Sequence, residues 1–447
     1  MSAPDQDNSP DPQSLAAADD GGVWRGDVAK RQVFYIPGYD PIHPRRYREL
    51  YRKESARQGE ISGYDIALSP KSGGAQYGWH VGAQIEGEEI QADVDVLVWS
   101  DIVRSSMSHG IAATYGQLVR TAYTYISTGA LRRLMWLRKG PVIAALYPVG
   151  MLILQALLAI GLFFSVKALL LWPLNAGLSA LPQSWQGGVF LGALGWLAWL
   201  IGMGAGGYAA YWLLTWFKAK DGKFFAHYLM HDYAYSARWG GANPEALEAR
   251  MAEFGDTIAQ ALNSDVDEVL IVGHSSGAHL AVSILADLIR AGRVPKIGPE
   301  LGFLSLGQVI PMMSFLPKAQ RLRRDLHDLS QSDALTWIDV TAPGDGCAFA
   351  LCDPVAVSGV EPKGGKLWPL VISAAFTKTL QPETWAALRW RFFKLHFQYL
   401  CAFDKPGDYD YFQITAGPRS LAERYEGRKP SQSRIDIAAS PYTDMAE

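Results

Sequence analysis

Apolar residues change their spacing within the stretch Glu268–Gly292. The four residues Val269–Val272 form a continuous aliphatic run, which is typical of a buried β-strand. Beyond the pentad Gly273–Gly277 (GHSSG), apolar residues recur at helical spacing up to Gly292, a residue type that commonly ends helices. The pattern therefore predicts a strand, then a sharp turn that carries Ser275, and then an amphipathic helix.

Similar patterns predict further elements along the chain. The predicted strands are Val33–Ile36, Tyr77–Ile85, Val94–Val103, Gly302–Val309, Leu335–Thr341 and Leu370–Ala374. The predicted helices are Arg45–Arg57, Ile111–Arg138, a helix that begins at Asn243–Pro244, and Thr384–Leu400. The apolar segment Ile310–Leu316 is predicted to be a loop.

Two much longer stretches contain no charged residue. Val142–Val166 has 25 residues and Gly187–Phe217 has 31. At a rise of about 1.5 Å per residue, each can cross a hydrocarbon core of roughly 30 Å. They predict a hairpin of two transmembrane helices, with a hairpin buried in a protein core as the alternative. In the second stretch, the pairs Gly188/Gly192 and Gly202/Gly206 have the G-x-x-x-G spacing that lets a neighbouring helix approach closely.

Basic residues flank this hairpin on its outer sides. They are Arg132, Arg133, Arg138 and Lys139 before the first helix, and Lys218, Lys220 and Lys223 after the second. The connecting segment Trp172–Gln186 has no charged residue. Because Lys and Arg are enriched in the cytosolic flanks of transmembrane helices, we expect both ends of the hairpin and both termini to face the cytosol.

Composition narrows the functional classes. The chain has 447 residues, of which 49% are hydrophobic, and its net charge of -3 argues against a nucleic-acid partner. Cys347, Cys352 and Cys401 lack the spacing with histidines that a zinc site would show, so we expect reduced thiols. No glycine-rich phosphate loop, metal-ligand pattern or dinucleotide pattern is present, so no cofactor and no metal are expected. Met1–Gly22 has no apolar run and predicts a disordered tail, not a signal peptide.

The GHSSG pentad, between a buried strand and an amphipathic helix, resembles the nucleophile elbow (G-x-S-x-G) of the α/β-hydrolase family. Its glycines remove Cβ atoms that would clash in so sharp a turn, and they let Ser275 adopt a strained backbone with its hydroxyl outward. The resemblance implies an α/β-hydrolase-type three-layer fold, with the hairpin inserted into it, and serine-hydrolase chemistry. A plain Gly/Ser loop is the alternative. We interpret His274 and His279 as packing residues.

In that family the catalytic residues follow the chain order serine, acid, histidine. Only His396 follows Leu335 in this sequence, so the resemblance assigns it the role of general base, with a core histidine as the alternative. Asp339, Asp345 and Asp353 compete for the role of the acid. Asp345 is preferred because it comes just after the end of a predicted strand, where the family presents functional side chains. Asp339 falls inside that strand, and Asp353 stays open as the alternative.

The strand Val33–Ile36 ends in a turn that is similar to the loop contributing an oxyanion-hole amide in α/β-hydrolases. Pro37 has no N–H to donate, so the resemblance assigns this role to the amide of Tyr39, or less favourably to that of Gly38. The second amide would be that of Ser276, the residue after the nucleophile. An ordinary β-turn is the alternative.

These interpretations divide the chain into successive parts. They are a disordered tail (1–22), the first part of an α/β-hydrolase domain (23–139), the transmembrane hairpin (140–217), the second part of that domain (218–427) and a second disordered tail (428–447). We expect a membrane-anchored serine hydrolase with a cytosolic catalytic domain, whose partners are the lipid bilayer and a lipid-like ester or thioester. A non-catalytic membrane scaffold, or an acyltransferase with the same triad, is the alternative, and the oligomeric state stays open.

Overall fold

The strands form one mixed sheet. The computed structural model describes residues 28–71, 73, 76–107, 110–180 and 189–446, and the strands among them pair in the order β2-β3-β4-β1-β5-β6-β7-β8. Their bounds are β1 Lys30–Ile36, β2 Asp65–Pro70, β3 Tyr77–Ile85, β4 Glu88–Val96, β5 Glu268–His274, β6 Glu300–Leu306, β7 Thr336–Thr341 and β8 Leu370–Ser373. Among the described strands of this sheet, β3 alone runs in the opposite direction to the other seven. The carboxyl ends of β1, β5 and β7 therefore meet at one edge, where open α/β sheets bind ligands.

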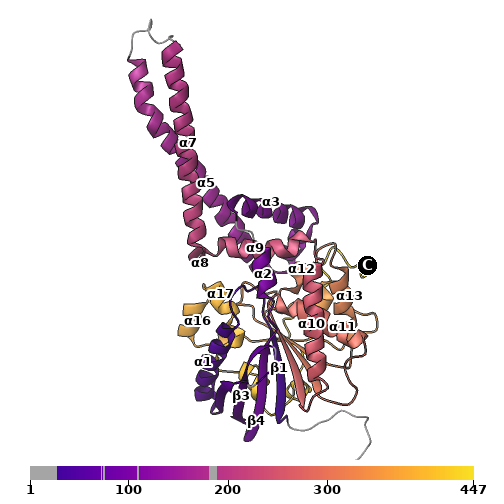
Figure 1. Cartoon of the computed structure of the whole chain (residues 1–447). Coiled ribbons are helices and arrows are strands. Elements are labelled where there is room, and N and C mark those ends of the chain that lie inside the picture. Colours follow the sequence, from indigo (N-terminus) through magenta and orange to yellow (C-terminus); the bar gives the residue numbers. More distant parts are fainter. Residues whose placement is uncertain (1–27, 72, 74–75, 108–109, 181–188, 447) are drawn as a thin grey trace, which may run out of the picture.

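Helices cover both faces of this sheet (Figure 1). Side chains alternate along β5, so that Leu270 and Val272 join the core on one face and Val269 and Ile271 the core on the other. The face of Val269 is covered by α10 (Glu245–Ala261), α11 (Gly277–Arg290) and α13 (Gln320–Gln331). The face of Leu270 is covered by α1 (Arg45–Ser62), α18 (Tyr411–Ala416) and the segment that leads to α19 (Leu421–Arg424). The α/β class predicted from the sequence is confirmed.

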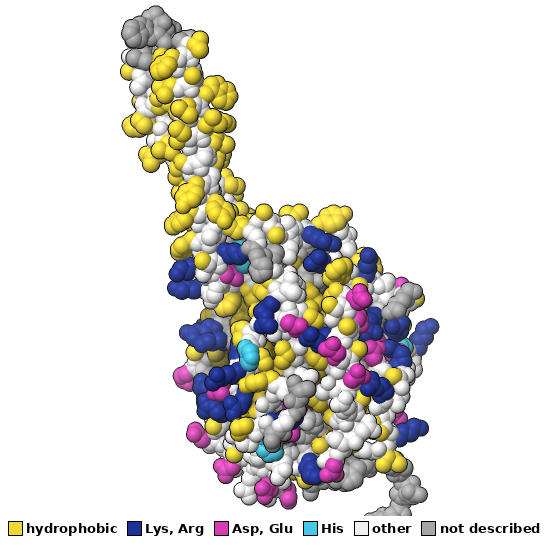
Figure 2. Space-filling model, in the orientation of Figure 1, with side chains coloured by type: hydrophobic (Ala, Val, Ile, Leu, Met, Phe, Trp, Pro, Cys, Tyr) yellow, Lys and Arg dark blue, Asp and Glu magenta, His cyan; other side chains and the backbone are white. Residues whose placement is uncertain are grey.

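Two long apolar helices leave this α/β body as a hairpin (Figures 1 and 2). They are α5 (Lys139–Ser179) and α7 (Val189–Ala219), which contain 18-residue windows with mean hydropathies of 2.4 and 1.7, and both are long and apolar enough to cross a membrane. A Cβ at Gly206 would lie 2.8 Å from the carbonyl oxygen of Phe163, so the 202/206 pair does let the helices touch. In the 188/192 pair, Gly192 faces open space and makes no such helix contact. Gly188 lies outside the described residues.

Shorter helices join the hairpin to the body. They are α2 (Ser100–Ser106), α3 (Ile111–Ser127) and α4 (Ala130–Leu137) before the hairpin, and α8 (Asp221–Phe224) and α9 (Ala226–Arg238) after it. The first turns of α5 belong to the body, because Val142 and Leu152 are buried. Leu152 packs with Met230 of α9 and with Leu118 of α3. The base of the hairpin is therefore held by a small apolar cluster of its own.

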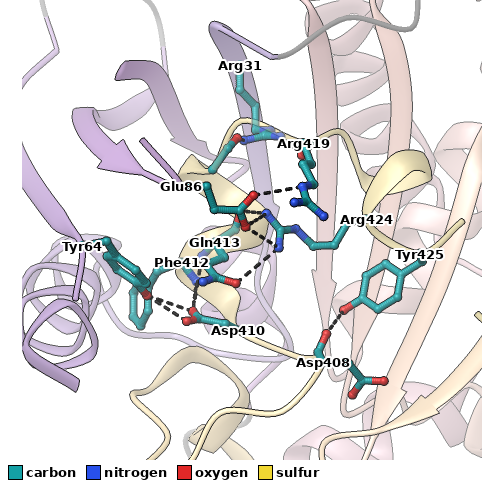
Figure 3. A network of polar contacts seen from close by, with 11 residues as sticks. Arg31, Tyr64, Glu86, Asp408, Asp410, Phe412, Gln413, Arg419, Arg424 and Tyr425 are labelled. Carbon is teal, nitrogen blue, oxygen red and sulfur yellow. Dashed lines mark hydrogen bonds and ion pairs between the residues drawn. The ribbon is translucent and has the colours of Figure 1, made fainter. Parts of the chain in front are cut away.

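A polar network joins the chain that precedes the hairpin to the chain near the carboxyl terminus (Figure 3). Arg424 reaches Glu86 at 3.4 Å and the side-chain oxygen of Gln413 at 3.3 Å. Asp410 accepts a hydrogen bond of 2.9 Å from the hydroxyl of Tyr64 and also caps α18. These contacts make the two sequence parts of the α/β body one folded unit.

The strand predicted at Val94–Val103 is wrong in its second half. β4 ends at Val96, and α2 follows after a short turn. The chain bends there because the indole Nε1–H of Trp99 donates to the carbonyl of Pro37 at 2.9 Å, which holds the turn against the end of β1.

Two segments predicted to be loops are partly helical. Ile310–Leu316 contains α12 (Ile310–Ser314), a single helical turn. The first hairpin helix continues to Ser179 and so occupies half of the expected connection Trp172–Gln186, because its residues stay uncharged and largely apolar up to that point. The part of the connection at 181–188 lies outside the described residues.

The disordered tail predicted at 428–447 is also wrong for the residues described. The N–H of Ser431 donates to the carbonyl of Val371 at 2.9 Å, beside the edge strand β8. The N–H of Ile435 donates to another backbone carbonyl at 2.7 Å. Backbone hydrogen bonds order this polar segment, and such bonds carry little sequence signal. The tail predicted at 1–22 lies outside the described residues.

We predict that Asp339→Asn will make the melting temperature less sensitive to alkaline pH. Asp339 is fully buried in β7, one of its carboxyl oxygens has no hydrogen-bond partner among the residues described, and burial raises its pKa to about 8. The folded protein thus keeps a proton that the unfolded chain releases above its ordinary pKa near 4, so stability falls as pH rises from about 4 to 8. The variant should match the wild type at pH 5 and exceed it at pH 8.5 in a thermal melt. Parallel melting curves across this range would contradict the assignment.

Candidate active site

Ser275 stands on the turn between β5 and α11 with a φ of 56°, a strained value for a residue with a side chain. A Cβ on Gly273 would lie 2.8 Å from the Cα of Ala278, and a Cβ on Gly277 would overlap the carbonyl oxygen of Ile36. Both glycines are therefore required by backbone packing. The predicted strand, sharp turn and helix are confirmed, together with the strained serine.

His396 lies at the end of α17 (Phe392–His396), and the single helix predicted at Thr384–Leu400 is wrong. The chain forms three short pieces instead, and the other two are α16 (Pro382–Leu388) and a 3-10 turn at Gln398–Leu400. Aromatic side chains of α16 and α17 pack against the glycines of the loop after β7. One straight helix could not follow that loop, so the breaks bring the histidine to it.

A second histidine fixes the position of His396. The Nε2 of His274 lies 3.0 Å from the carbonyl oxygen of His396 and donates to it. Burial lowers the pKa of His274 to about 3, which keeps the ring neutral with a single N–H. A Cβ on Gly307 would lie 3.0 Å from the Cε1 of His396, so the end of β6 also confines the ring. His274 packs as the sequence suggested, and it is in addition a hydrogen-bond donor.

Asp345 holds the imidazole of His396. The Nδ1 of His396 lies 2.7 Å from Oδ2 of Asp345, and both side chains are almost completely buried. The hydroxyl of Tyr399 donates to the same oxygen at 3.1 Å, and the N–H of Cys347 donates to Oδ1 at 2.9 Å. Burial alone would raise the pKa of Asp345, but the interaction with His396 and these hydrogen bonds lower it below its usual value. An ionised carboxylate accepts only, so His396 donates through Nδ1–H.

The other two aspartates considered from the sequence lie elsewhere. Asp353 caps α14 (Pro354–Val357) through two backbone N–H groups and pairs with Lys366. Asp339 points into the sheet, where it accepts a hydrogen bond of 2.6 Å from Ser305. Of the three aspartates, the structure thus brings only Asp345 into contact with His396, whereas Asp339 and Asp353 have other partners.

Ser275 and His396 line one cavity of about 60 Å³. The residues around it are Pro141, Leu229, Asp232, Tyr233, Ser236, Ser275, Ser276, His279, Val309, Met312, Met313, Cys347, Phe393 and His396. The Nε2 of His396 is buried and makes no hydrogen bond within the described part of the chain. A histidine with one unused nitrogen and the strained serine therefore line the same cavity.

The turn after β1 lies directly beside the serine. A Cβ on Gly38 would be 3.0 Å from the Cβ of Ser275 and 3.4 Å from its Oγ. The backbone N–H groups of Tyr39 and Ser276 donate to no protein group among the residues described. Tyr39 is buried against Trp99 and its hydroxyl contacts Ser106 at 2.6 Å, which fixes the turn. Both amides considered for an oxyanion hole are thus near Ser275 and unused.

Sequence reasoning missed three residues of this site. Tyr399 supports Asp345, and no motif marks it. Cys347 contributes its backbone N–H, a role that does not depend on side-chain type. Asp232 of α9 lines the cavity, and burial raises its pKa to about 7. The available signal was that Asp232 is the one acidic residue of α9. His279, interpreted as packing, also lines the cavity, and burial lowers its pKa to about 4.

The ligand atoms of Asp345, Cys347 and His396 all lie within 4.8 Å of one another, close enough to hold a metal ion. The carboxylate oxygens are already used by His396, Tyr399 and a backbone N–H. Burial raises the pKa of the Cys347 thiol well above its usual value, so the thiol stays protonated, whereas metals bind thiolate. These donors fit a hydrogen-bonded acid and base better than a metal centre.

The two competing aspartates can be separated by matched substitutions. Under the serine-hydrolase hypothesis of the sequence analysis, Asp345→Asn should lower turnover of an ester by roughly 10³- to 10⁴-fold, because the amide cannot hold the required tautomer of His396. Asp353→Asn should lower the melting temperature by several degrees, because Lys366 loses the nearer of its two carboxylate partners, and should leave most of the turnover intact. Steady-state kinetics and thermal melts of both variants decide the question. A larger loss of turnover in Asp353→Asn than in Asp345→Asn would assign the role of the acid to Asp353 instead.

Comparison with known proteins gives no family for this chain: no protein-family model matches it, and no match is found among curated proteins or among solved structures.

Proposed function

We propose that this chain is a membrane-anchored serine hydrolase that cleaves lipid-like carboxylic esters or thioesters. One observation carries the proposal. A serine with a strained backbone lines the same cavity as a buried histidine, whose Nδ1 is held by Asp345 and whose Nε2 is unused. This arrangement of side chains is what activation of a serine hydroxyl requires.

In the acylation step, the Oγ of Ser275 attacks the acyl carbonyl carbon while Nε2 of His396 takes the hydroxyl proton. The charge that develops on the imidazole is stabilised by Asp345 through the 2.7 Å hydrogen bond. The carbonyl oxygen becomes an oxyanion, which the N–H groups of Ser276 and Tyr39 would bind. When the tetrahedral intermediate collapses, His396 returns the proton to the leaving alcohol or thiol, and an acyl-serine remains.

In the second step, water attacks the acyl-serine. His396 takes a proton from the water and then gives it to Oγ of Ser275, which releases the acid and restores the enzyme. The contact between the hydroxyl and Nε2 is absent before substrate binds, as is common in unliganded hydrolases whose catalytic hydrogen bonds tighten in the complex.

The arrangement of elements supports an α/β-hydrolase type of fold for this proposal. The strand before the serine is central, and its neighbour β1 ends in the turn at Gly38. In such folds the oxyanion hole combines the amide after the serine with one from the loop of a neighbouring strand. The acid follows β7 and the histidine comes last in the chain.

Two features favour a lipid-like substrate. The cavity wall is mostly apolar, with Leu229, Val309 and Met312 among its residues. Pro141, in the first turn of α5, also lines it, so the hairpin begins at the wall of the site. A bilayer crossed by the hairpin would lie on the side of the body where α5 meets the cavity wall, and each methylene group of an acyl chain that stays out of water on the way avoids a cost of about 0.8 kcal/mol.

The same proposal includes an orientation in the membrane. Both ends of the hairpin return to one α/β body, so the two parts of that body lie on the same side. The basic residues at those ends, among them Lys139 and Lys218, favour the cytosolic side.

The proposal predicts covalent labelling of one serine. Ser275→Ala should abolish reaction with a fluorophosphonate, since its nucleophile is gone. Ser276→Ala is the matched control and should still react, because it keeps the backbone N–H that the oxyanion hole uses. Gel fluorescence of both variants, with circular dichroism to check folding, gives the result. If Ser275→Ala is labelled as strongly as the wild-type protein, the proposal is wrong. If the wild-type protein does not react with the fluorophosphonate, the proposal is also wrong, and a non-catalytic scaffold is favoured.

A second prediction concerns the hairpin and its role in access to a substrate in the bilayer. Phe163 contacts Gly206, so positions 157 and 212 lie level on the two antiparallel helices. A short Gly/Ser linker in place of 157–212 keeps the buried base of α5. We expect this variant to hydrolyse a short soluble ester at close to the wild-type rate and long-chain esters in vesicles at least 10-fold more slowly. Equal rates on the vesicle substrate would show that the substrate does not arrive from the bilayer.

A further inference from the structure

α3 carries an apolar stripe that faces away from the body. Val119, Tyr123 and Ile126 are 65%, 72% and 64% exposed. Their spacing of four and three residues puts them on one side of the helix. Trp136 of α4, which is 61% exposed, adds a fourth apolar side chain. Figure 1 shows α3 lying across the top of the body, beside the base of the hairpin and crossing its direction. We call these four residues the α3 stripe.

The opposite side of α3 is firmly attached. Thr121 and Tyr125 are buried, and the hydroxyl of Tyr125 donates to the carbonyl of Met312 at 3.0 Å. Leu118 packs in the cluster at the base of the hairpin together with residues of α9. The helix is therefore a fixed part of the body. The described residues of this chain nevertheless leave more than half of each side chain of the α3 stripe exposed.

The height of α3 along the hairpin follows from two contacts. The hydroxyl of Tyr115, at the start of α3, donates to the carbonyl of Leu152 at 2.9 Å. Gly206 of α7 lies against Phe163 of α5, and continuing this antiparallel register places Leu152 opposite Phe217. α3 is therefore level with the end of α7.

That level has the features of a membrane interface. Trp212 and Trp216 stand in the last turns of α7, followed by Lys218, and interfacial Trp and Lys are typical of helix ends. At about 1.5 Å per residue, a hydrocarbon layer of roughly 30 Å that starts at Leu152 ends near Trp172. Trp172 is 72% exposed, as an anchor at the far interface would be. The bilayer that fits the hairpin thus has its near surface at α3.

The charge of this region is one-sided. No Asp or Glu occurs between Asp101 and Asp221, whereas the charged residues of that stretch are all Arg or Lys. Arg120, Arg132 and Arg133 are exposed on α3 and α4. A helix with an apolar stripe and only basic charges suits the boundary between headgroups and acyl chains of an anionic leaflet.

We propose that α3 and α4 lie in the plane of the membrane, with the α3 stripe below the headgroups and Arg120, Arg132 and Arg133 at the phosphates of anionic lipids. The inference rests on the proposed crossing of the bilayer by α5 and α7. It adds a second attachment through α3, which packs against α9, the helix that contributes Leu229 to the cavity. With two attachments the body cannot swing about the base of the hairpin, and the cavity keeps one orientation to the bilayer.

Spin labels at three single positions test this arrangement in the full chain, reconstituted in anionic vesicles after its native cysteines are replaced by alanine. Tyr123→Cys reports on the α3 stripe and Leu157→Cys, at an exposed site of α5, on the hairpin. Ala252→Cys, at an exposed site of α10 in the body, is the aqueous control. We expect the labels at 123 and 157 to collide more often with oxygen than with a water-soluble nickel chelate, and the label at 252 to do the reverse.

The outcomes separate the inference from the crossing on which it rests. A lipid signature at 157 with an aqueous signature at 123 would overturn the in-plane helix and leave the crossing intact. Aqueous signatures at both would remove the crossing and the inference together. A label at 123 that is shielded from both reagents would indicate a protein partner and would also overturn the inference.

Discussion

The contact between Gly277 and the end of β1 is the constraint on which the candidate site depends. Any side chain at 277 would overlap the carbonyl oxygen of Ile36, so α11 can start only where glycine lets the two backbones meet. That contact forces the sharp turn, gives Ser275 its φ of 56°, and sets the serine beside Gly38. Backbone packing thus places the proposed nucleophile beside the turn that carries the unused amide of Tyr39.

The proposed base and acid are held differently, by burial and hydrogen bonds. Taking a carboxylate out of water is costly, and Asp345 recovers that cost through His396, Tyr399 and a backbone N–H. His274 then holds the backbone of His396. Each of these groups is satisfied except Nε2 of His396, which lies at the cavity. Among the described residues, the groups that hold His396 are thus satisfied, whereas Nε2 of His396 and Nδ1 of His279, two residues whose rings line the cavity, make no hydrogen bond.

The sequence was most informative where local backbone rules decide the structure. The strand, turn and helix around Ser275 follow from apolar spacing and two glycines, and β3 was predicted at its observed bounds. The two apolar helices follow from length and lack of charge. Asp345 was chosen over Asp353 because it follows a strand, and the geometry brings it to His396.

The sequence was least informative where tertiary contacts decide. The helix predicted at Thr384–Leu400 breaks to follow the loop after β7, and the polar segment after Arg428 is ordered by backbone pairing with an edge strand. Tyr399 and Asp232 reach the site from elements whose position depends on the whole fold. None of these contacts leaves a periodic pattern in the chain.

The hairpin and the site are one structural unit in this account. The first turns of α5 are buried in the body, Pro141 lines the cavity, and α9 packs between α3 and the site. A body attached in this way would present one opening to the bilayer. The proposed chemistry and the proposed location therefore fit one another, while each rests on separate observations.

The central claim is that Ser275, the two amides and His396 act on one acyl carbonyl. A structure of the chain after reaction with a fluorophosphonate tests it most directly. The account predicts phosphorus bonded to Oγ of Ser275, with the phosphoryl oxygen accepting from the N–H groups of Ser276 and Tyr39 and with Nε2 of His396 facing the bridging oxygen. An adduct on another residue, or a phosphoryl oxygen directed away from both amides, would contradict it.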